Sequence, residues 1–285
     1  MNDLTTSIKI RGTKVPLTGL GTTQLWYHDP IAEKAMKTAL SNGWIRMIDC
    51  AEMYGNGEAE LAAGQAVHDS GVKRESLFII DKILPSNADH EHFRTSLINS
   101  LKRVGTEYFD LYLLHWRENA DLCTVVREME YAKRDGLIKE WGVSNFDLED
   151  MVDLFNVSGG NHCFADQVLY NVTERGPEYD LFNFLEANDV LPMSYSSLGS
   201  NSSTKNIFAL NKDIQNICLE TGISPQALML SFNTYSGKIA SIFSSSSIDH
   251  ILEDLKGVSF NIEPYLNVIS ANFPAPAAKV PLHKI

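Results

Sequence analysis

Apolar residues along this chain gather in eight short runs, each of a length typical of a buried β-strand. Between these runs lie longer segments in which apolar residues recur every three to four positions, as on one face of a helix. The predicted strands are Leu17–Thr22, Trp44–Asp49, Leu77–Ile83, Leu111–His115, Glu140–Asn145, Phe164–Leu169, Leu191–Ser196 and Ile239–Ser244. The predicted helices are Pro30–Ser41, Glu58–Ser70, Glu91–Val104, Leu122–Asp135, Leu148–Asn156, Tyr179–Asn188, an extended region Ile207–Thr221 followed by Pro225–Tyr235, and Asp249–Lys256.

Eight strands that alternate with helices predict a parallel sheet with helical crossovers. Closure into a single (β/α)8 barrel over residues 1–285 is the natural architecture for eight such repeats. A doubly wound open sheet is the alternative. It is less favoured because the run Gly19–Gln24, after the first strand, lacks the third glycine of a dinucleotide-binding loop.

Three segments fall outside the alternating repeat. Ser7–Val15 predicts a β-hairpin that could cover one mouth of the barrel. Ser194–Thr204 is rich in Ser, Asn and Gly, which predicts a mobile loop. The tail Phe273–Ile285 carries three prolines and shows no periodicity.

Composition narrows the class of protein further. The chain has 285 residues, of which 44% are hydrophobic, and no stretch approaches the roughly 20 apolar residues of a membrane span. The first residues show no secretory signal, so we expect a cytoplasmic protein. A net charge of −12 argues against nucleic acid or anionic membrane as partners. The four cysteines lack zinc-site spacing, so we expect no metal site. We also expect a monomer.

Each predicted strand has a polar residue at or near its carboxyl end. In a parallel barrel the carboxyl ends of the strands share one face, and that face carries the active site. Eight polar ends of mixed chemistry therefore indicate a mouth lined for a ligand. These positions are Thr22, Asp49, Lys82, His115, Asn145, Gln167, Tyr195 and Ser244.

Three of these residues, together with Tyr54, form a possible acid–base set. Each alone has an ordinary structural explanation, but each supplies what another needs. A tyrosine has a reference pKa of about 10, which is high for acid–base work at neutral pH. The ammonium of Lys82 would lower that pKa, and Asp49 could hold the ammonium in place. The imidazole of His115 could orient a substrate oxygen.

Asp49, Tyr54, Lys82 and His115 resemble the catalytic tetrad of the aldo-keto reductases, and the resemblance covers nearly the whole chain. Three further segments suggest the bacterial methylglyoxal reductase branch of that family. They are 84–88, 115–117 and 159–161. The segments that carry the family resemblance are 51–58 (AEMYGNGE), 101–106 (LKRVGT), 110–116 (DLYLLHW) and 141–146 (WGVSNF).

The resemblance implies NAD(P)H-dependent reduction of small aldehydes or ketones, methylglyoxal-like or aromatic, with Tyr54 as general acid. It implies that Trp116 and Trp26 line the substrate pocket together with Tyr54 and His115, and that Tyr195 stacks on the nicotinamide. Ser144, Asn145 and Gln167 would hold the carboxamide, and Ser196, Leu198 and Gly199 would pass the pyrophosphate. The full cofactor set would be Gly21, Thr22, Thr23, Asp49, Ser144, Asn145, Gln167, Tyr195, Ser196, Leu198, Gly199, Ser244, Ser245 and His250.

The last predicted strand departs from the family pattern. Ser244 and His250 stand where the family usually carries a lysine and an arginine for the 2′-phosphate of NADPH. Each lost charge-assisted contact is worth about 1.5–3 kcal/mol, so two could weaken NADPH roughly 10²- to 10⁴-fold. We therefore expect NADP(H) with weakened affinity, and NAD(H) or dual use as the alternative. Lys205 and Lys238 are possible replacements that the sequence does not position.

Two other functions compete with carbonyl reduction. One is a catalytically weak barrel that binds a nucleotide as a redox-sensing or structural protein, although such a protein has no need of Tyr54. The other is a Schiff-base lyase that uses Lys82, which leaves Asn145, Gln167 and Tyr195 unexplained.

Overall fold

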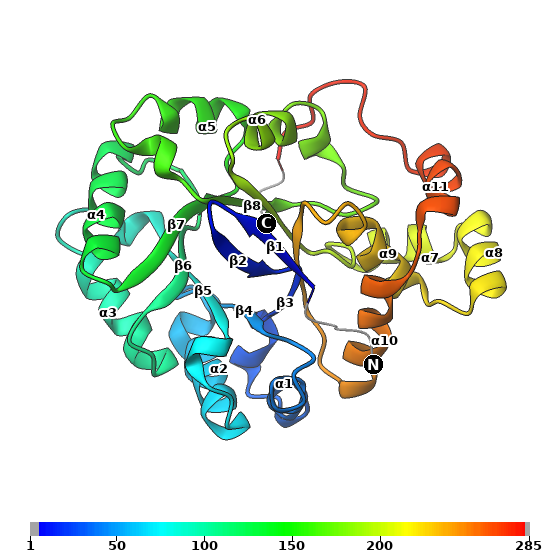
Figure 1. The fold of residues 1–285 in the computed structure, drawn as a ribbon, viewed down its shortest axis with the longest axis horizontal. Coiled ribbons are helices and arrows are strands. Elements are labelled where there is room, and N and C mark those ends of the chain that lie inside the picture. The colour runs from blue at the N-terminus through cyan, green and yellow to red at the C-terminus, as the bar shows by residue number, and fades with distance from the viewer. Residues whose placement is uncertain (1–5, 283–285) are drawn as a thin grey trace.

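Eight parallel strands close into a barrel at the centre of the molecule (Figure 1). The structure, a computed structural model, describes residues 6–282. Each strand pairs with the next along the chain, and the last pairs with the first to close the barrel. The barrel strands are β3 (Thr18–Gly21), β4 (Met47–Asp49), β5 (Phe78–Ile83), β6 (Phe109–Leu114), β7 (Ile138–Ser144), β8 (Ala165–Leu169), β9 (Leu191–Tyr195) and β10 (Ala240–Phe243).

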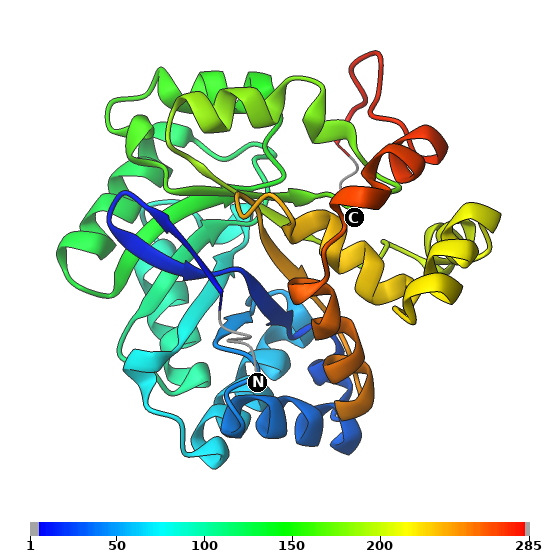
Figure 2. The ribbon, with the colours of Figure 1, turned by 45° about the vertical axis from the view of Figure 1, so that its right-hand side comes forward.

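Helices surround the barrel on its outside (Figures 1 and 2). The predicted (β/α)8 architecture is therefore confirmed, and α1 and α2 have the predicted bounds. The helices are α1 (Pro30–Ser41), α2 (Glu58–Ser70), α3 (Phe93–Val104), α4 (Leu122–Arg134), α5 (Leu148–Phe155), α6 (Leu181–Ala187), α7 (Ser202–Ala209), α8 (Lys212–Thr221), α9 (Pro225–Thr234), α10 (Ile248–Ser259) and α11 (Leu266–Asn272).

The segment after β9 differs from its prediction in two ways. The predicted loop Ser194–Thr204 contains the start of α7, because the side chain of Asn201 caps the backbone of Thr204 and nucleates a helix there. The extended helical region Ile207–Thr221 is divided in two, because Asn211 caps a new helix, α8. Helix α11 was not predicted, since it is short and lies close to the proline-containing tail.

The predicted hairpin is present as β1 (Ser7–Ile10) and β2 (Thr13–Pro16). Its two-residue turn, Arg11–Gly12, has positive φ at both positions, as in a type I′ turn. The guanidinium of Arg11 donates to the backbone carbonyls of Cys163 and Asn188 at 3.0 and 2.9 Å. In Figure 1 the hairpin lies across the barrel, and it covers the mouth at which the strands begin.

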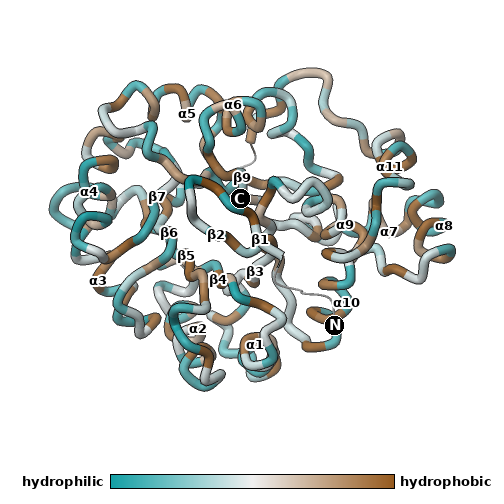
Figure 3. The backbone as a smooth tube through the Cα atoms, viewed as in Figure 1, coloured by the Kyte–Doolittle hydropathy of each residue, from teal (hydrophilic) through white to brown (hydrophobic). Residues whose placement is uncertain are grey.

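Two layers of apolar residues build the core, one inside the barrel and one between the strands and the helices. The inner layer includes Phe78, Ile80, Leu111 and Leu113, and Val15 of the hairpin packs against it. The outer layer contains the alternate strand residues and the buried faces of the helices. Figure 3 shows apolar residues along the strands and on part of each surrounding helix.

No helix within residues 6–282 is long and apolar enough to cross a membrane. The predictions that involve residues 1–5 and the last three residues of the tail lie outside the described part of the chain. The cytoplasmic location and the monomeric state stay predictions.

Candidate active site

Side-chain alternation along the strands explains why the polar strand ends meet inside the barrel mouth. Residues at every second position of a strand face the same side. In β5, Phe78 and Ile80 face the barrel interior, so Lys82 does too. In β6, Leu111 and Leu113 face inward, so His115 follows in the same phase. The same phase brings Asp49, Gln167 and Tyr195 inward from β4, β8 and β9, and it brings Ser244 inward directly after β10.

Asp49 and Lys82 form a buried ion pair at the base of the pocket. Lys82 Nζ donates to Asp49 Oδ2 at 2.7 Å and to the carbonyl oxygen of Cys50 at 3.0 Å. Gln167 Nε2 donates to the other carboxylate oxygen of Asp49 at 2.8 Å. Burial opposes the charge on Lys82, but Asp49 and Tyr54 outweigh it and raise its pKa. Lys82 is therefore a fixed ammonium at neutral pH.

Tyr54 lies over this ammonium. It begins a short 3-10 turn, Tyr54–Gly57, and Lys82 Nζ lies 5.3 Å from the centroid of its ring. Burial raises the pKa of the Tyr54 phenol, Lys82 lowers it and Asp49 raises it, with a net increase above the ordinary value. The sequence predicted a net decrease. Lys82 acts in the predicted direction, but desolvation outweighs it, so the phenol carries its proton at neutral pH.

His115 is a neutral imidazole held between two aromatic rings. The ring of Trp116 stacks on it with centroids 3.8 Å apart, and Tyr54 meets it edge-on at 5.8 Å. Burial and the charge of Lys82 lower the pKa of His115 to about 2. Its Nδ1 is buried and has no hydrogen-bond partner among the described residues.

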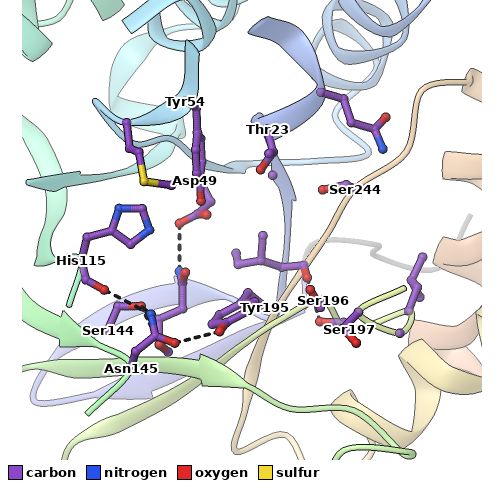
Figure 4. Close-up of a pocket in the computed structure, with 18 of the residues that line it drawn as sticks. Thr23, Asp49, Tyr54, His115, Ser144, Asn145, Tyr195, Ser196, Ser197 and Ser244 are labelled. Atoms are coloured by element: carbon purple, nitrogen blue, oxygen red, sulfur yellow. Dashed lines mark hydrogen bonds between the residues drawn. The ribbon is translucent and has the colours of Figure 1, made fainter. Parts of the chain in front are cut away.

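Ser144, Asn145 and Tyr195 form a second polar group, on the side of the pocket below His115 in Figure 4. Asn145 Nδ2 donates to the carbonyl oxygen of His115 at 3.1 Å and to Ser144 Oγ at 3.2 Å. The Tyr195 hydroxyl donates to Asn145 Oδ1 at 2.7 Å. These bonds fix the Asn145 amide and link β7 to β9 across the mouth.

Two residues of the pocket rim adopt left-handed backbone conformations. Asn145 has φ of 60° directly after β7, and Ser196 has φ of 51° directly after β9. Asparagine tolerates this region, whereas serine adopts it at a cost of about 1 kcal/mol or more. The surrounding fold therefore holds backbone strain at the mouth of this pocket, where such strain often accompanies function.

A cavity of about 430 Å³ unites these groups. Most predicted site residues line it, and Figure 4 shows Thr23 and Ser244 on the side opposite His115. Five predicted residues do not line it: Thr22 and Lys82 are buried beside it, Trp26 packs on Gly55, and Ser245 and His250 lie outside. The predicted residues that do line it are Gly21, Thr23, Asp49, Tyr54, His115, Trp116, Ser144, Asn145, Gln167, Tyr195, Ser196, Leu198, Gly199 and Ser244.

The sequence missed several lining residues, because loops and a helix supply most of them rather than strand ends. Lys205 reaches the cavity from α7, a helix that was not predicted at that position. Lys238, the other candidate cation, precedes β10 at the opposite mouth and is ion-paired with Glu186. The missed lining residues are Gln24, Met53, Ser197, Ser200, Lys205 and Ile242.

The arrangement suits proton transfer to a polar atom in the cavity. It combines a protonated phenol, a fixed ammonium and a neutral imidazole around one space that accepts a small molecule. Within residues 6–282, no group of three or more His, Cys, Asp or Glu side chains is placed to hold a metal ion.

Known proteins resemble this chain in sequence and in fold. The sequence model of the Aldo/keto reductase family matches residues 18–266. Methylglyoxal reductase YeaE of Escherichia coli is 32% identical over 277 residues, 95% of each chain.

Two solved structures of aldo/keto reductases from Klebsiella pneumoniae resemble this fold, each at 30% identity. One, in complex with NADP and acetate, has a TM-score of 0.90 over 98% of this chain and 99% of its own. The other, in complex with NADPH, has a TM-score of 0.89 over 99% of each chain. Because the family model spans most of the sequence and these relatives match it nearly end to end, this chain belongs to the aldo/keto reductase family.

Proposed function

We propose that this protein reduces small aldehydes and ketones to alcohols with a nicotinamide cofactor, and that Tyr54 is the general acid. The observation that carries the proposal is the convergence of Asp49, Tyr54, Lys82 and His115 on one cavity in a member of this family. Relatives named as methylglyoxal reductases, and related structures in complex with NADP or NADPH, support the same reaction class.

The residues on the cofactor side of the cavity fit a nicotinamide nucleotide. Gly21 lines the cavity without a side chain, and a Cβ atom there would come within 2.9 Å of Ser244 Oγ, so the glycine lets β3 and the segment after β10 approach closely. Ser144, Asn145 and Gln167 offer hydroxyl and amide groups of the kind that bind a carboxamide. Hydride for the carbonyl carbon is the chemistry that the cofactor supplies when bound.

Tyr54 transfers the proton that completes the reduction. Its raised pKa keeps the hydroxyl protonated before the reaction, and the hydroxyl proton moves to the carbonyl oxygen as negative charge develops there. Lys82 stabilises the phenolate that remains, because its ammonium lies 5.3 Å from the ring centroid and is anchored by Asp49. Lys82 therefore offsets the negative charge that remains on Tyr54 when the proton leaves.

His115 positions the carbonyl oxygen beside Tyr54. A neutral imidazole can donate one N–H hydrogen bond without competing as a proton source, and the low pKa of His115 keeps it neutral. Because Nδ1 is buried, we assign this donor role to Nε2. Stacking on Trp116 fixes the plane of the ring.

An apolar wall on the substrate side suits small carbonyl compounds with flat or apolar substituents. Trp116 and Met53 line the cavity there, and Trp26 packs on Gly55 directly after Tyr54. Methylglyoxal and aromatic aldehydes both match this description. The methylglyoxal reductases among the relatives support the first of these.

Binding and turnover together test the proposal. The purified protein is titrated with NADH and with NADPH by fluorescence, and turnover of methylglyoxal and benzaldehyde is then measured with each cofactor. We expect at least one cofactor to bind and at least one aldehyde to be reduced. Failure of both cofactors to bind would overturn the proposal that this protein is a reductase. Binding of a cofactor without reduction of any carbonyl would favour a redox-sensing or structural role.

A further inference from the structure

Lys205 is the one lysine or arginine that lines the cavity within the described residues. Lys82 is buried beside the cavity and is neutralised by Asp49. A nicotinamide dinucleotide carries a pyrophosphate, and NADPH carries a further phosphate on the adenosine ribose. A chain with a net charge of −12 offers no general attraction for such an anion, so a local cation is needed.

The position of Lys205 is fixed by its helix and by a glycine. Asn201 caps α7, and its carbonyl oxygen accepts from the backbone N–H of Lys205 at 3.1 Å. The stem of Lys205 crosses Gly199, because a Cβ atom on that glycine would come within 2.9 Å of Lys205 Cγ. Gly199 has φ of 93° and is itself part of the cavity wall. The absence of a side chain there lets the lysine lie against the cavity.

The ammonium of Lys205 has no bonded partner among the described residues. It makes no ion pair or side-chain hydrogen bond within residues 6–282, whereas seven other lysines in that range have a carboxylate partner. The carboxyl of Asp254 on α10 lies close enough to His250 and Lys205 for both charges to act on it, which places the Lys205 ammonium near α10. Ser244, also in the cavity wall, follows β10 directly and belongs to the short segment that leads into α10.

We propose that Lys205 binds the 2′-phosphate of NADPH and selects NADPH over NADH. This cation, supplied from α7, compensates for Ser244, which follows β10 directly. This inference rests on the proposed function, since it assumes that a nicotinamide cofactor occupies the cavity with its ring at Tyr54. The adenosine end of such a cofactor then extends to the side opposite His115, where Figure 4 shows Ser244, and Lys205 lines the same cavity.

The test is cofactor binding to the free enzyme, measured by fluorescence titration without substrate. Lys205→Met keeps the length of the side chain and removes its charge. We expect it to weaken NADPH binding roughly tenfold to a hundredfold and to leave NADH within about twofold of the wild type. The dependence of NADPH affinity on salt becomes shallower in the variant, because one phosphate contact is lost. Lys212→Met, at the start of α8 and outside the cavity wall, is the matched control and keeps wild-type binding.

A second variant separates the charge from the position. Ser244→Lys in the Lys205→Met background places a cation directly after β10 in the wall of the same cavity, and we expect it to restore NADPH binding. Unchanged NADPH affinity in Lys205→Met would overturn the inference. Equal weakening of NADPH and NADH would also overturn it, because the lysine would then contact the pyrophosphate. A wild-type protein that binds neither cofactor is a failure of the proposed function rather than of Lys205.

Discussion

Lys82 donates from Nζ to Oδ2 of Asp49 over 2.7 Å, and the two side chains are only 1% and 4% exposed. A buried pair of this kind gains little over well-packed apolar residues, because both charges lose their hydration. Its presence on two neighbouring strands is therefore better explained by a need for charge below Tyr54 than by stability. Each charge of the pair nevertheless depends on the other, because loss of one leaves the other buried without its counter-charge.

Asp49→Asn leaves the Lys82 ammonium buried without its counter-charge. Breaking a buried pair from one side typically costs about 3–5 kcal/mol, so we expect a large fall in the free energy of unfolding measured with urea. Carbonyl reduction falls as well, since the lysine is no longer held under the phenol.

The matched control for this variant is Glu186→Gln, which removes the partner of Lys238 in an exposed pair. Exposed pairs contribute little because water and salt screen them, so the control keeps nearly wild-type stability. Similar losses in the two variants would mean that the Asp49–Lys82 pair is no more important to the fold than a surface contact.

His115 makes stability depend on acid. Its pKa is about 2 in the fold and about 6.5 in the unfolded chain, so the unfolded chain binds one more proton between these values. Its stabilising effect is complete above pH 6.5 and is lost as pH falls toward 2, by up to about 1.4 kcal/mol per pH unit. His115→Asn removes this slope from the pH dependence of urea unfolding, whereas His68→Asn, at an exposed histidine, leaves it unchanged.

Asp81 makes stability depend on pH in the direction opposite to His115. It is fully buried behind Lys82 on the helix side of β5, and burial and the nearby Glu60 raise its pKa well above the ordinary value. The neutral carboxyl stabilises the fold fully below about pH 4, and that contribution is lost as pH rises through the raised pKa. Asp81→Asn mimics the neutral form, so we expect it to match or exceed wild-type stability at pH 7. A variant less stable than wild type at pH 7 would show that the ionised carboxylate is needed.

Trp116 connects substrate binding with the orientation of His115, because the two rings stack 3.8 Å apart. Trp116→Ala removes the apolar wall and the stacking partner, so KM for benzaldehyde rises roughly three- to tenfold and kcat falls. Trp116→Phe retains a ring and loses less of both. If the two variants behave alike in steady-state kinetics, the stacked plane has no role in positioning.

The inward direction of several strand-end residues was predictable from the sequence, because barrel geometry makes that direction a matter of phase. Once Phe78 and Ile80 are recognised as interior residues of β5, Lys82 must face the same way. His115 follows from Leu111 and Leu113 by the same rule. The hairpin was predictable for a similar reason, since its strands and its turn are local in sequence.

The features that the sequence did not predict depend on packing between distant segments. Two local features bring Lys205 to the cavity wall. Asn201 starts α7 within the segment that was expected to be a loop, and Gly199 has no side chain to displace the lysine stem. The net direction of the Tyr54 pKa depends on the balance of burial against Lys82, and no pattern in the sequence measures burial. The loop positions and the Tyr54 pKa therefore depend on contacts between distant segments, whereas strand phase is local in sequence.

The most direct test of Tyr54 as the proton donor is Tyr54→Phe, which removes one hydroxyl and retains the ring over Lys82. Cofactor affinity is measured first by fluorescence, followed by kcat for the aldehyde that the wild type reduces best. We predict unchanged cofactor binding and a fall in kcat of roughly 10²- to 10⁴-fold, the usual contribution of a positioned general acid. A Tyr54→Phe variant that binds cofactor and keeps kcat within threefold of wild type would contradict the assignment of Tyr54 as the proton donor.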